Sequence, residues 1–134
     1  MATMQLGASN FEHTVAGNEI VLVDFWAAWC GPCRQFAPVY ERASEAHRDI
    51  VFGKVDTEAE QSLAAAAHIT SIPTLMAFKD GSLVFSQPGA LPASTLEQVI
   101  ASVRDLDMAE VRAEESAAAA ERLDDKSDNI ARSS

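Results

Sequence analysis

Two cysteines separated by two residues, Cys30 and Cys33, are the only thiols in this 134-residue chain. They follow an apolar run at residues 20–25 and precede residues 32–47, whose apolar spacing favours a helix. A Cys-x-x-Cys pair between a strand and a helix places a dithiol at a helix N-terminus. Such a dithiol can open and close a disulfide, so the pattern predicts thiol–disulfide exchange chemistry.

The spacing of the two cysteines suits a bond that forms and breaks. Residues three apart in a first helical turn have Cβ atoms roughly 5–6 Å apart, and a disulfide needs about 3.5–4.5 Å. Because a cap residue is not locked in helical dihedrals, a small change at Cys30 closes the gap. Unpaired N–H groups and the helix dipole favour a thiolate there. We therefore expect Cys30 to attack, with a lowered pKa, and the more buried Cys33 to resolve.

The residues around the cysteines fit this placement. Pro32 suits an early helix position, where its missing N–H costs nothing. Gly31 leaves room for a substrate backbone to approach Cys30. Arg34 follows Cys33, and its charge either favours the thiolate or is solvated. The motif is therefore compatible with a reactive thiol that is open to a substrate.

Two other interpretations of the pair are a structural disulfide and half of a zinc site. A loop this short gains only about 2 kcal/mol in the chain-entropy model, against roughly 4.7 kcal/mol for a 100-residue loop. Structural zinc usually needs four ligands, whereas the histidines, His13, His47 and His68, are scattered. We therefore expect a redox-active Cys30–Cys33 disulfide and no metal.

Composition limits the classes of function. With 48% hydrophobic and 22% charged residues, the chain suits one globular domain with a core. Its formal net charge of -10 repels nucleic acid and anionic membranes, so we expect neither as a partner. We see no signal peptide, and the longest apolar run, residues 20–28, is too short to span a bilayer. The two cysteines form no secreted disulfide framework, which predicts a cytoplasmic protein.

Two strands and the helix between them predict a parallel βαβ unit. Residues 20–26 are apolar on both faces, as in a central strand, and residues 50–56 form the second strand. Asp24 interrupts the first strand. If buried, its carboxyl would have a raised pKa and suit a proton acceptor for Cys33 through water; otherwise it faces solvent at the strand end. Lys54 either pairs with Asp24 or is exposed.

The rest of the chain predicts a helix, a hairpin and a final helix. Residues 58–68 have high helix propensity. Residues 74–78 and 82–86 predict two antiparallel strands joined by a tight turn. The last helix is predicted to start with a capping box formed by Ser94 and Glu97.

These features resemble the thioredoxin family. The resemblance rests on Trp29-Cys30-Gly31-Pro32-Cys33 after a Val-Asp-Phe-Trp strand and on Ile72-Pro73-Thr74, and it covers roughly residues 9–107. It implies an α/β thioredoxin fold, with a central mixed sheet of four or five strands flanked by about four helices. It also implies that Pro73 is cis and packs against the dithiol, that Asp24 accepts the proton of Cys33, and that Lys54 pairs with Asp24.

The resemblance further implies an activity, the reduction of protein disulfides through a mixed disulfide on Cys30 that Cys33 resolves. Family members with Gly-Pro between the cysteines are reducing; they bind no cofactor and draw on NADPH through a flavoprotein thioredoxin reductase. The expected partners are that reductase and disulfide-containing proteins, docked as extended strands. Gly89 is either the family's glycine beside the active site or a plain turn glycine. The implied substrate-binding residues are Trp29, Gly31, Pro32, Ile72, Pro73, Gly89 and Ala90.

Two other functions stay open. An oxidase or isomerase of the same fold would need a more oxidising dithiol, and the Gly-Pro dipeptide and the lack of a visible signal peptide argue against it. In a binding module, by contrast, the cysteines would be dispensable. Replacing Cys33 by Ser separates these functions, because a reductase then holds its substrate covalently on Cys30.

The chain after residue 107 departs from the family pattern. We expect a thioredoxin domain at 1–107 and an acidic, alanine-rich extension at 108–134. Four alanines at 117–120 favour helix, whereas residues 127–129 and 132–134 have the composition of disordered chain. This predicts a marginal helix that frays into a solvated tail. A monomer is the default expectation.

Overall fold

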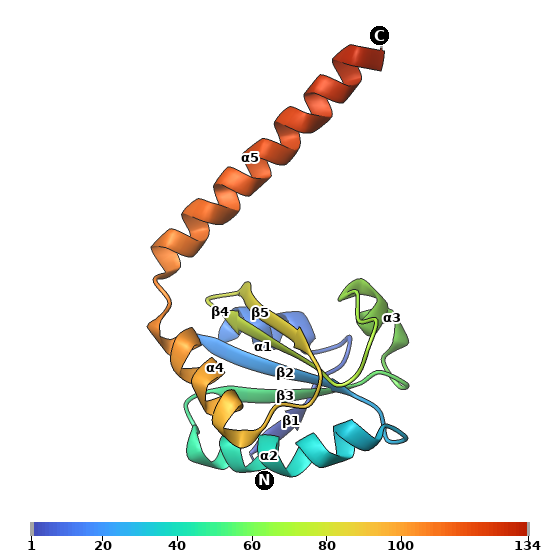
Figure 1. The fold of residues 1–134 in the computed structure, drawn as a ribbon, viewed down its shortest axis with the longest axis vertical. Helices are drawn as coiled ribbons and strands as arrows, with labels where there is room; N and C mark the ends of the chain where they lie inside the picture. The colour runs from blue at the N-terminus through green and yellow to red at the C-terminus, as the bar shows by residue number, and fades with distance from the viewer. Residues whose placement is uncertain (1, 134) are drawn as a thin grey trace.

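The computed structural model describes the backbone of residues 2–133 and the side chains of residues 2–120, arranged around a five-stranded sheet (Figure 1). Four helices flank the sheet, and a fifth projects from it. The strands are β1 (Thr3–Gln5), β2 (Ile20–Trp26), β3 (Val51–Asp56), β4 (Thr74–Lys79) and β5 (Ser82–Pro88). The helices are α1 (Phe11–Gly17), α2 (Gly31–Ala46), α3 (Gln61–Ala66), α4 (Ala93–Asp105) and α5 (Met108–Ser133).

Strand β2 lies at the centre of the sheet, whose order is β1-β3-β2-β4-β5. Strands β1, β3 and β2 are parallel, whereas β4 is antiparallel to β2 and β5 is antiparallel to β4. Every β2 residue before Trp26 is buried, because helices cover both faces of the sheet. The predicted mixed sheet and central strand are confirmed. The carboxyl end of β2 leads directly to the start of α2.

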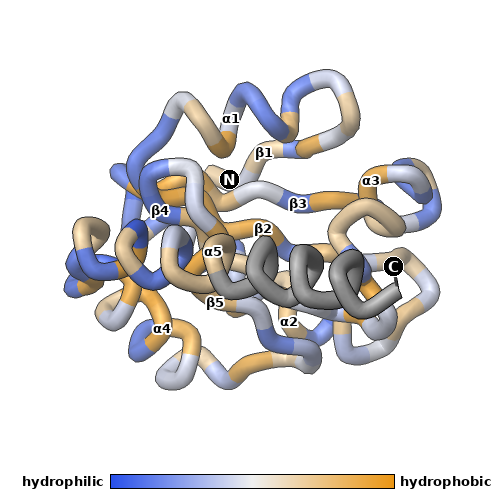
Figure 2. The backbone as a smooth tube through the Cα atoms, turned by 90° about the horizontal axis from the view of Figure 1, so that it is seen from above, coloured by the Kyte–Doolittle hydropathy of each residue, from blue (hydrophilic) through white to orange (hydrophobic). Residues whose placement is uncertain are grey.

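Two apolar clusters hold the helices against the two faces of the sheet. One cluster includes Phe36 of α2 and Ile100 of α4. The other includes Val15 of α1, and the partly buried Leu63 of α3 packs against it. Figure 2 shows the two helix pairs on opposite sides of the strands. Fully burying each large side chain contributes roughly 1.5–3 kcal/mol. The buried Tyr40 hydroxyl also donates to the Gly53 carbonyl at 2.8 Å, which ties the middle of α2 to β3.

The start of α4 differs from the sequence-based prediction. The helix begins at Ala93 after Pro92, and no side chain makes a capping bond there. The predicted capping box of Ser94 and Glu97 is therefore wrong. Glu97 instead contacts His47 at the C-terminus of α2, with 2.7 Å between Oε2 and Nε2. A contact with a residue 50 positions away outweighs the local pattern.

Helix α3 is shorter than predicted, beginning at Gln61 rather than at residue 58. The Asp56 side chain accounts for the difference, because its Oδ1 accepts the backbone N–H groups of Glu58 (2.9 Å) and Ala59 (3.4 Å). Such a side-chain bond competes with helical hydrogen bonds and holds a turn. This turn places Glu58 beside the end of β2.

Helix α5 projects from the sheet (Figure 1). Its first turns contact the β4–β5 turn, where Arg112 pairs with Asp80 (3.5 Å) and the Ser82 hydroxyl donates to Glu115 (3.3 Å). The helix continues to Ser133, through residues 127–129 and 132–133, whose composition predicted disorder; Ser134 lies outside the described residues. No glycine or proline follows Met108 to interrupt it. Among the described helices, none has the length and apolar character needed to cross a membrane.

Candidate active site around the Cys30–Cys33 disulfide

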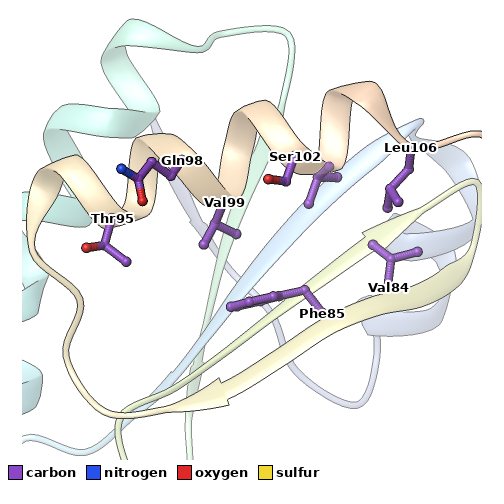
Figure 3. Close-up of a pocket in the computed structure, with 8 residues that line it drawn as sticks. Val84, Phe85, Thr95, Gln98, Val99, Ser102 and Leu106 are labelled. Atoms are coloured by element: carbon purple, nitrogen blue, oxygen red, sulfur yellow. The ribbon is translucent and has the colours of Figure 1, made fainter.

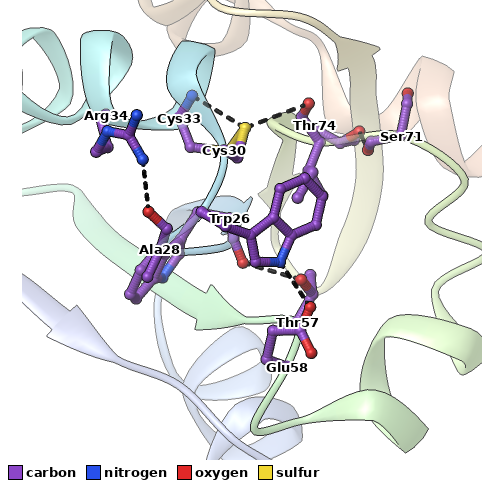
Figure 4. The surroundings of a disulfide bond; sticks show 11 residues. Trp26, Ala28, Cys30, Cys33, Arg34, Thr57, Glu58, Ser71 and Thr74 are labelled. Atoms are coloured by element: carbon purple, nitrogen blue, oxygen red, sulfur yellow. Dashed lines mark hydrogen bonds between the residues drawn. A yellow bond between two sulfur atoms is a disulfide. The ribbon is translucent and has the colours of Figure 1, made fainter.

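Cys30 and Cys33 form a disulfide at the start of α2, with their Cα atoms 5.2 Å apart (Figure 4). Cys30 is the N-cap residue of the helix, and its Sγ accepts the backbone N–H of Cys33 at 3.2 Å. Both cysteines are buried, at 4% and 3% exposure. The Cys33 N–H therefore points toward the Cys30 sulfur at the positive end of the helix dipole, which favours a negative charge on that sulfur.

The segment between β2 and α2 is held at both ends. The Trp26 carbonyl accepts two hydrogen bonds from Thr57, one from its backbone N–H (2.9 Å) and one from its side-chain hydroxyl (3.0 Å). The Cys30 N–H donates to the Ala27 carbonyl at 3.2 Å, and Ala27 is fully buried. Residues after β3 thus hold the chain just before the first cysteine.

Trp29, directly before Cys30, has an exposed side chain, at 67% exposure. Its indole Nε1 donates to Glu58 Oε1 at 2.7 Å. Across the motif, Arg34 Nη1 donates to the Ala28 carbonyl at 2.8 Å (Figure 4). Sequence reasoning did not place Glu58 or Thr57 at the site, because neither belongs to a motif. The Asp56 turn after β3 was the only local signal that could have pointed to them.

The loop before β4 lies on the other side of Cys30. The Ile72–Pro73 peptide bond is cis, the isomer that the family resemblance implied. The Ile72 carbonyl oxygen lies 3.8 Å from Cys30 Sγ. The Gly89 N–H donates to the Pro73 carbonyl at 2.8 Å, and Gly89 has a φ of 100°, a conformation that favours glycine. Gly89 therefore lies beside the cis-proline loop.

Asp24 lies in the interior of the sheet at 1% exposure, rather than facing solvent at a strand end. Neither of its carboxylate oxygens has a hydrogen-bond partner among the described residues. Burial raises the pKa of Asp24 from 3.8 to about 7, while the charge of Lys54 lowers that pKa by a smaller amount. The carboxyl can therefore exchange a proton near neutral pH.

Lys54 is the neighbour of Asp24 across the parallel β2–β3 pair. It is half-buried, and its Nζ lies 5.1 Å from the centre of the Trp26 ring. Lys54 and Trp26 line a cavity of about 90 Å³ together with Cys33 and Arg34. The lysine thus lies between the buried carboxyl and a hollow beside the second cysteine, without a hydrogen bond to Asp24 in the described part of the chain.

Two further features lie outside this chemistry. Among the described residues, no group of three or more His, Cys, Asp or Glu side chains could hold a metal ion. A second cavity of about 320 Å³ lies between α4 and β5 (Figure 3). Apolar side chains such as Phe85, Val99 and Leu106 line this cavity. Neither cysteine of the dithiol is among its lining residues.

A model of the thioredoxin family matches residues 2–102 of the chain. The chain belongs to the thioredoxin family. It is 60% identical over 111 residues to a Streptomyces coelicolor protein named "Putative thioredoxin 2", covering 83% of each chain. It is 45% identical over 103 residues to the thioredoxin of Alicyclobacillus acidocaldarius, covering 76% of this chain and 98% of that one. The solved Plasmodium falciparum thioredoxin has a TM-score of 0.69 and 38% identity, covering 75% of this chain and 97% of that one.

Membership of the thioredoxin family, together with the Cys30–Cys33 disulfide, makes the chain a thiol–disulfide oxidoreductase. The predicted family, fold and enzyme class are confirmed. Family membership also implies that its partners are disulfide-containing proteins and that it needs no bound cofactor. The thioredoxin match ends at residue 102, before helix α5.

Proposed function

We propose that the chain reduces protein disulfides in two exchange steps. In the first, the Cys30 thiolate attacks one sulfur of the substrate disulfide. The substrate S–S bond breaks, a mixed disulfide forms on Cys30, and the other substrate sulfur leaves as a thiolate that takes up a proton. In the second, the Cys33 thiolate attacks Cys30 Sγ and releases the remaining substrate thiol. Two electrons pass from the dithiol to the substrate, leaving Cys30 and Cys33 oxidised.

The position of Cys30 at the N-cap of α2 is the observation that carries this proposal. Its sulfur accepts the Cys33 N–H at 3.2 Å and faces the positive end of the helix dipole. Both interactions stabilise a thiolate more than a thiol. Cys33 lies one turn further along the helix, so an incoming disulfide would meet Cys30 first.

We assign Asp24 as the proton acceptor for Cys33. Cys33 is 3% exposed and has to lose its proton before the second step. A carboxyl with a pKa of about 7 can take up a proton near neutral pH and release it again. The cavity of about 90 Å³ beside Cys33 is large enough for water. Lys54 lines this cavity and acts as the electrostatic partner of Asp24.

The proposed substrate surface surrounds Cys30. On one side the exposed Trp29 indole offers an apolar contact, and a Cβ added at Gly31 would meet no atom within 4 Å. On the other side the backbone of Ile72 is available to an extended substrate strand. The complete set comprises Trp29, Gly31, Pro32, Ile72, Pro73, Gly89 and Ala90.

The remaining parts of the proposal concern the cellular role. We infer that a flavoprotein thioredoxin reductase restores the dithiol with electrons from NADPH, as the family does. We also infer that the chain works as a monomer in the cytoplasm, where glutathione keeps thiols reduced. We further infer that residues 1–107 form the catalytic domain and that residues 108–134 form an extension.

Replacing Cys33 by Ser tests the first step. When the reduced variant meets a synthetic peptide with one disulfide, we expect a stable peptide adduct on Cys30, measured by mass spectrometry. The matched Cys30→Ser variant should form no such adduct. If both variants leave the peptide untouched, the chain is a binding module and the proposal fails.

The redox potential of the dithiol tests the direction of the reaction. We expect a potential below about −230 mV in glutathione or dithiothreitol buffers, as suits a cytosolic reductant. A potential above about −200 mV would favour an oxidase or isomerase instead.

A further inference from the structure

Arg34 is an exposed cation directly beside the dithiol. Its side chain makes a single hydrogen bond among the described residues, from Nη1 to the Ala28 carbonyl at 2.8 Å, and no ion pair in that part of the chain. A guanidinium carries five N–H donors in a fixed planar fork. Most of these donors are therefore free for a group outside the chain, and carboxylates match their geometry best.

The other cations near the site are already engaged. Lys54 is half-buried over the Trp26 ring and interacts with Asp24. Further from the site, Arg48 pairs with Glu45, Arg104 with Asp49 and Arg112 with Asp80. In a chain with a net charge of -10, Arg34 is thus a local positive site on a surface that otherwise repels acidic segments.

We propose that Arg34 selects substrates that carry an acidic residue next to the cysteine under attack. This inference rests on the proposed function, because it concerns the same attack by Cys30. A substrate strand that pairs with Ile72 passes over Cys30 and continues toward the Arg34 side of the motif. Figure 4 shows Arg34 and Thr74 on opposite sides of the cysteines. A carboxylate beside the substrate cysteine can then meet the free donors of Arg34.

The expected effect is modest, because the pair forms in a solvent-exposed position. Exposed ion pairs contribute about 0.2–1 kcal/mol, which corresponds to roughly 1.4- to fivefold in a rate constant. For peptides with glutamates on both sides of the cysteine, we therefore expect Arg34 to raise the rate constant of the reaction about threefold. Salt at about 1 M should remove most of the effect, since the screening length then falls to about 3 Å.

Single-turnover kinetics with two peptides test this inference. Both are disulfide-linked dimers of a short single-cysteine peptide, with the cysteine flanked by glutamine in one and by glutamate in the other. The reduced protein is mixed with each, and chromatography follows the released peptide thiol. The informative quantity is the ratio of the second-order rate constants, glutamate peptide over glutamine peptide.

We expect Arg34→Gln to lower this ratio about threefold and Arg34→Lys, which keeps the charge, to preserve most of it. Arg42→Gln is the matched control, because Arg42 is exposed on the same helix eight positions further along. It should leave the ratio unchanged. An unchanged ratio in Arg34→Gln, or an equal fall in Arg42→Gln, would overturn the inference.

The glutamine peptide separates this inference from the proposed function. If the natural protein reduces neither peptide, the proposed function itself fails. If all variants reduce the glutamine peptide and the ratio does not respond to Arg34, only the selection of acidic substrates is wrong. If Arg34→Gln slows both peptides equally, Arg34 acts through the Ala28 carbonyl as a positioning residue, and the selection is likewise refuted.

Discussion

Replacing Asp24 by Asn removes a carboxyl whose ionised form is disfavoured by burial in the folded chain. Burial raises the pKa of Asp24 from 3.8 to about 7 in the folded chain. In the unfolded chain the carboxyl is hydrated and ionises near its ordinary value. A shift of about three pKa units, at about 1.36 kcal/mol each, means that ionised Asp24 costs the folded state about 4 kcal/mol. This is a large fraction of the stability of a small domain.

The pH dependence of this cost has a definite sign. Below about pH 4 the carboxyl is protonated in both states and costs nothing. As pH rises from about 4 to about 7, the unfolded chain ionises first, so the folded state loses stability; above about pH 7 the loss is complete. The Asp24→Asn variant lacks this loss. Its free energy of unfolding minus that of the natural protein should therefore rise by about 4 kcal/mol between about pH 4 and pH 8.

Urea denaturation of the two disulfide-bonded proteins at several pH values measures this difference. Groups that titrate in both proteins cancel in the subtraction. Asp105→Asn, at an exposed carboxyl of α4, is the control and should give a nearly flat difference. A flat curve for Asp24→Asn as well, or a difference that falls with pH, would show that Lys54 holds Asp24 ionised and would refute the reasoning. The same variant should also resolve the mixed disulfide on Cys30 more slowly.

Two other substitutions test the packing around the sheet. Lys79 is buried and donates to three carbonyls at the end of α4, those of Val103 (2.9 Å), Arg104 (2.8 Å) and Leu106 (3.1 Å). Lys79→Met should therefore lower the free energy of unfolding, measured by urea denaturation, by about 3 kcal/mol. Gly89→Ala places a side chain at a φ of 100° and should lower the free energy of unfolding by about 1–2 kcal/mol. Gly17→Ala is the matched control, because no atom lies within 4 Å of the added Cβ, and it should change the free energy of unfolding by less than about 0.5 kcal/mol. Equal effects of the two alanine substitutions would contradict the argument from φ, and a neutral Lys79→Met would show that water satisfies those carbonyls.

The local sequence pattern was sufficient to predict the dithiol and the two elements on either side of it, strand β2 and helix α2. Continuous apolar character marked β2 as a central strand, and the position of Cys30 before α2 followed from the spacing of the motif. These features depend on residues close together in the chain, so the sequence displays them directly. The same logic failed at Ser94, where a local capping pattern lost to a contact between helices.

The family resemblance supplied what local pattern left open. Spacing alone did not decide whether Asp24 was buried or at a solvent-facing strand end, and an X-Pro bond is usually trans. Both Asp24 and Pro73 have the arrangement that the resemblance implied. The reason is that burial and proline isomer depend on the packing of the whole sheet, which a family preserves and a short segment does not encode.

The sequence by itself thus determined the chemistry of this protein: a dithiol at a helix start, on an α/β domain. The tertiary structure alone decided what surrounds that dithiol. The Glu58 bond to Trp29 joins residues 29 apart, and Lys79 reaches the end of α4 across 24 to 27 positions. No periodicity links such residues, because folding the sheet and docking the helices bring them together. These contacts hold the rim of the site and the helix that leads to α5.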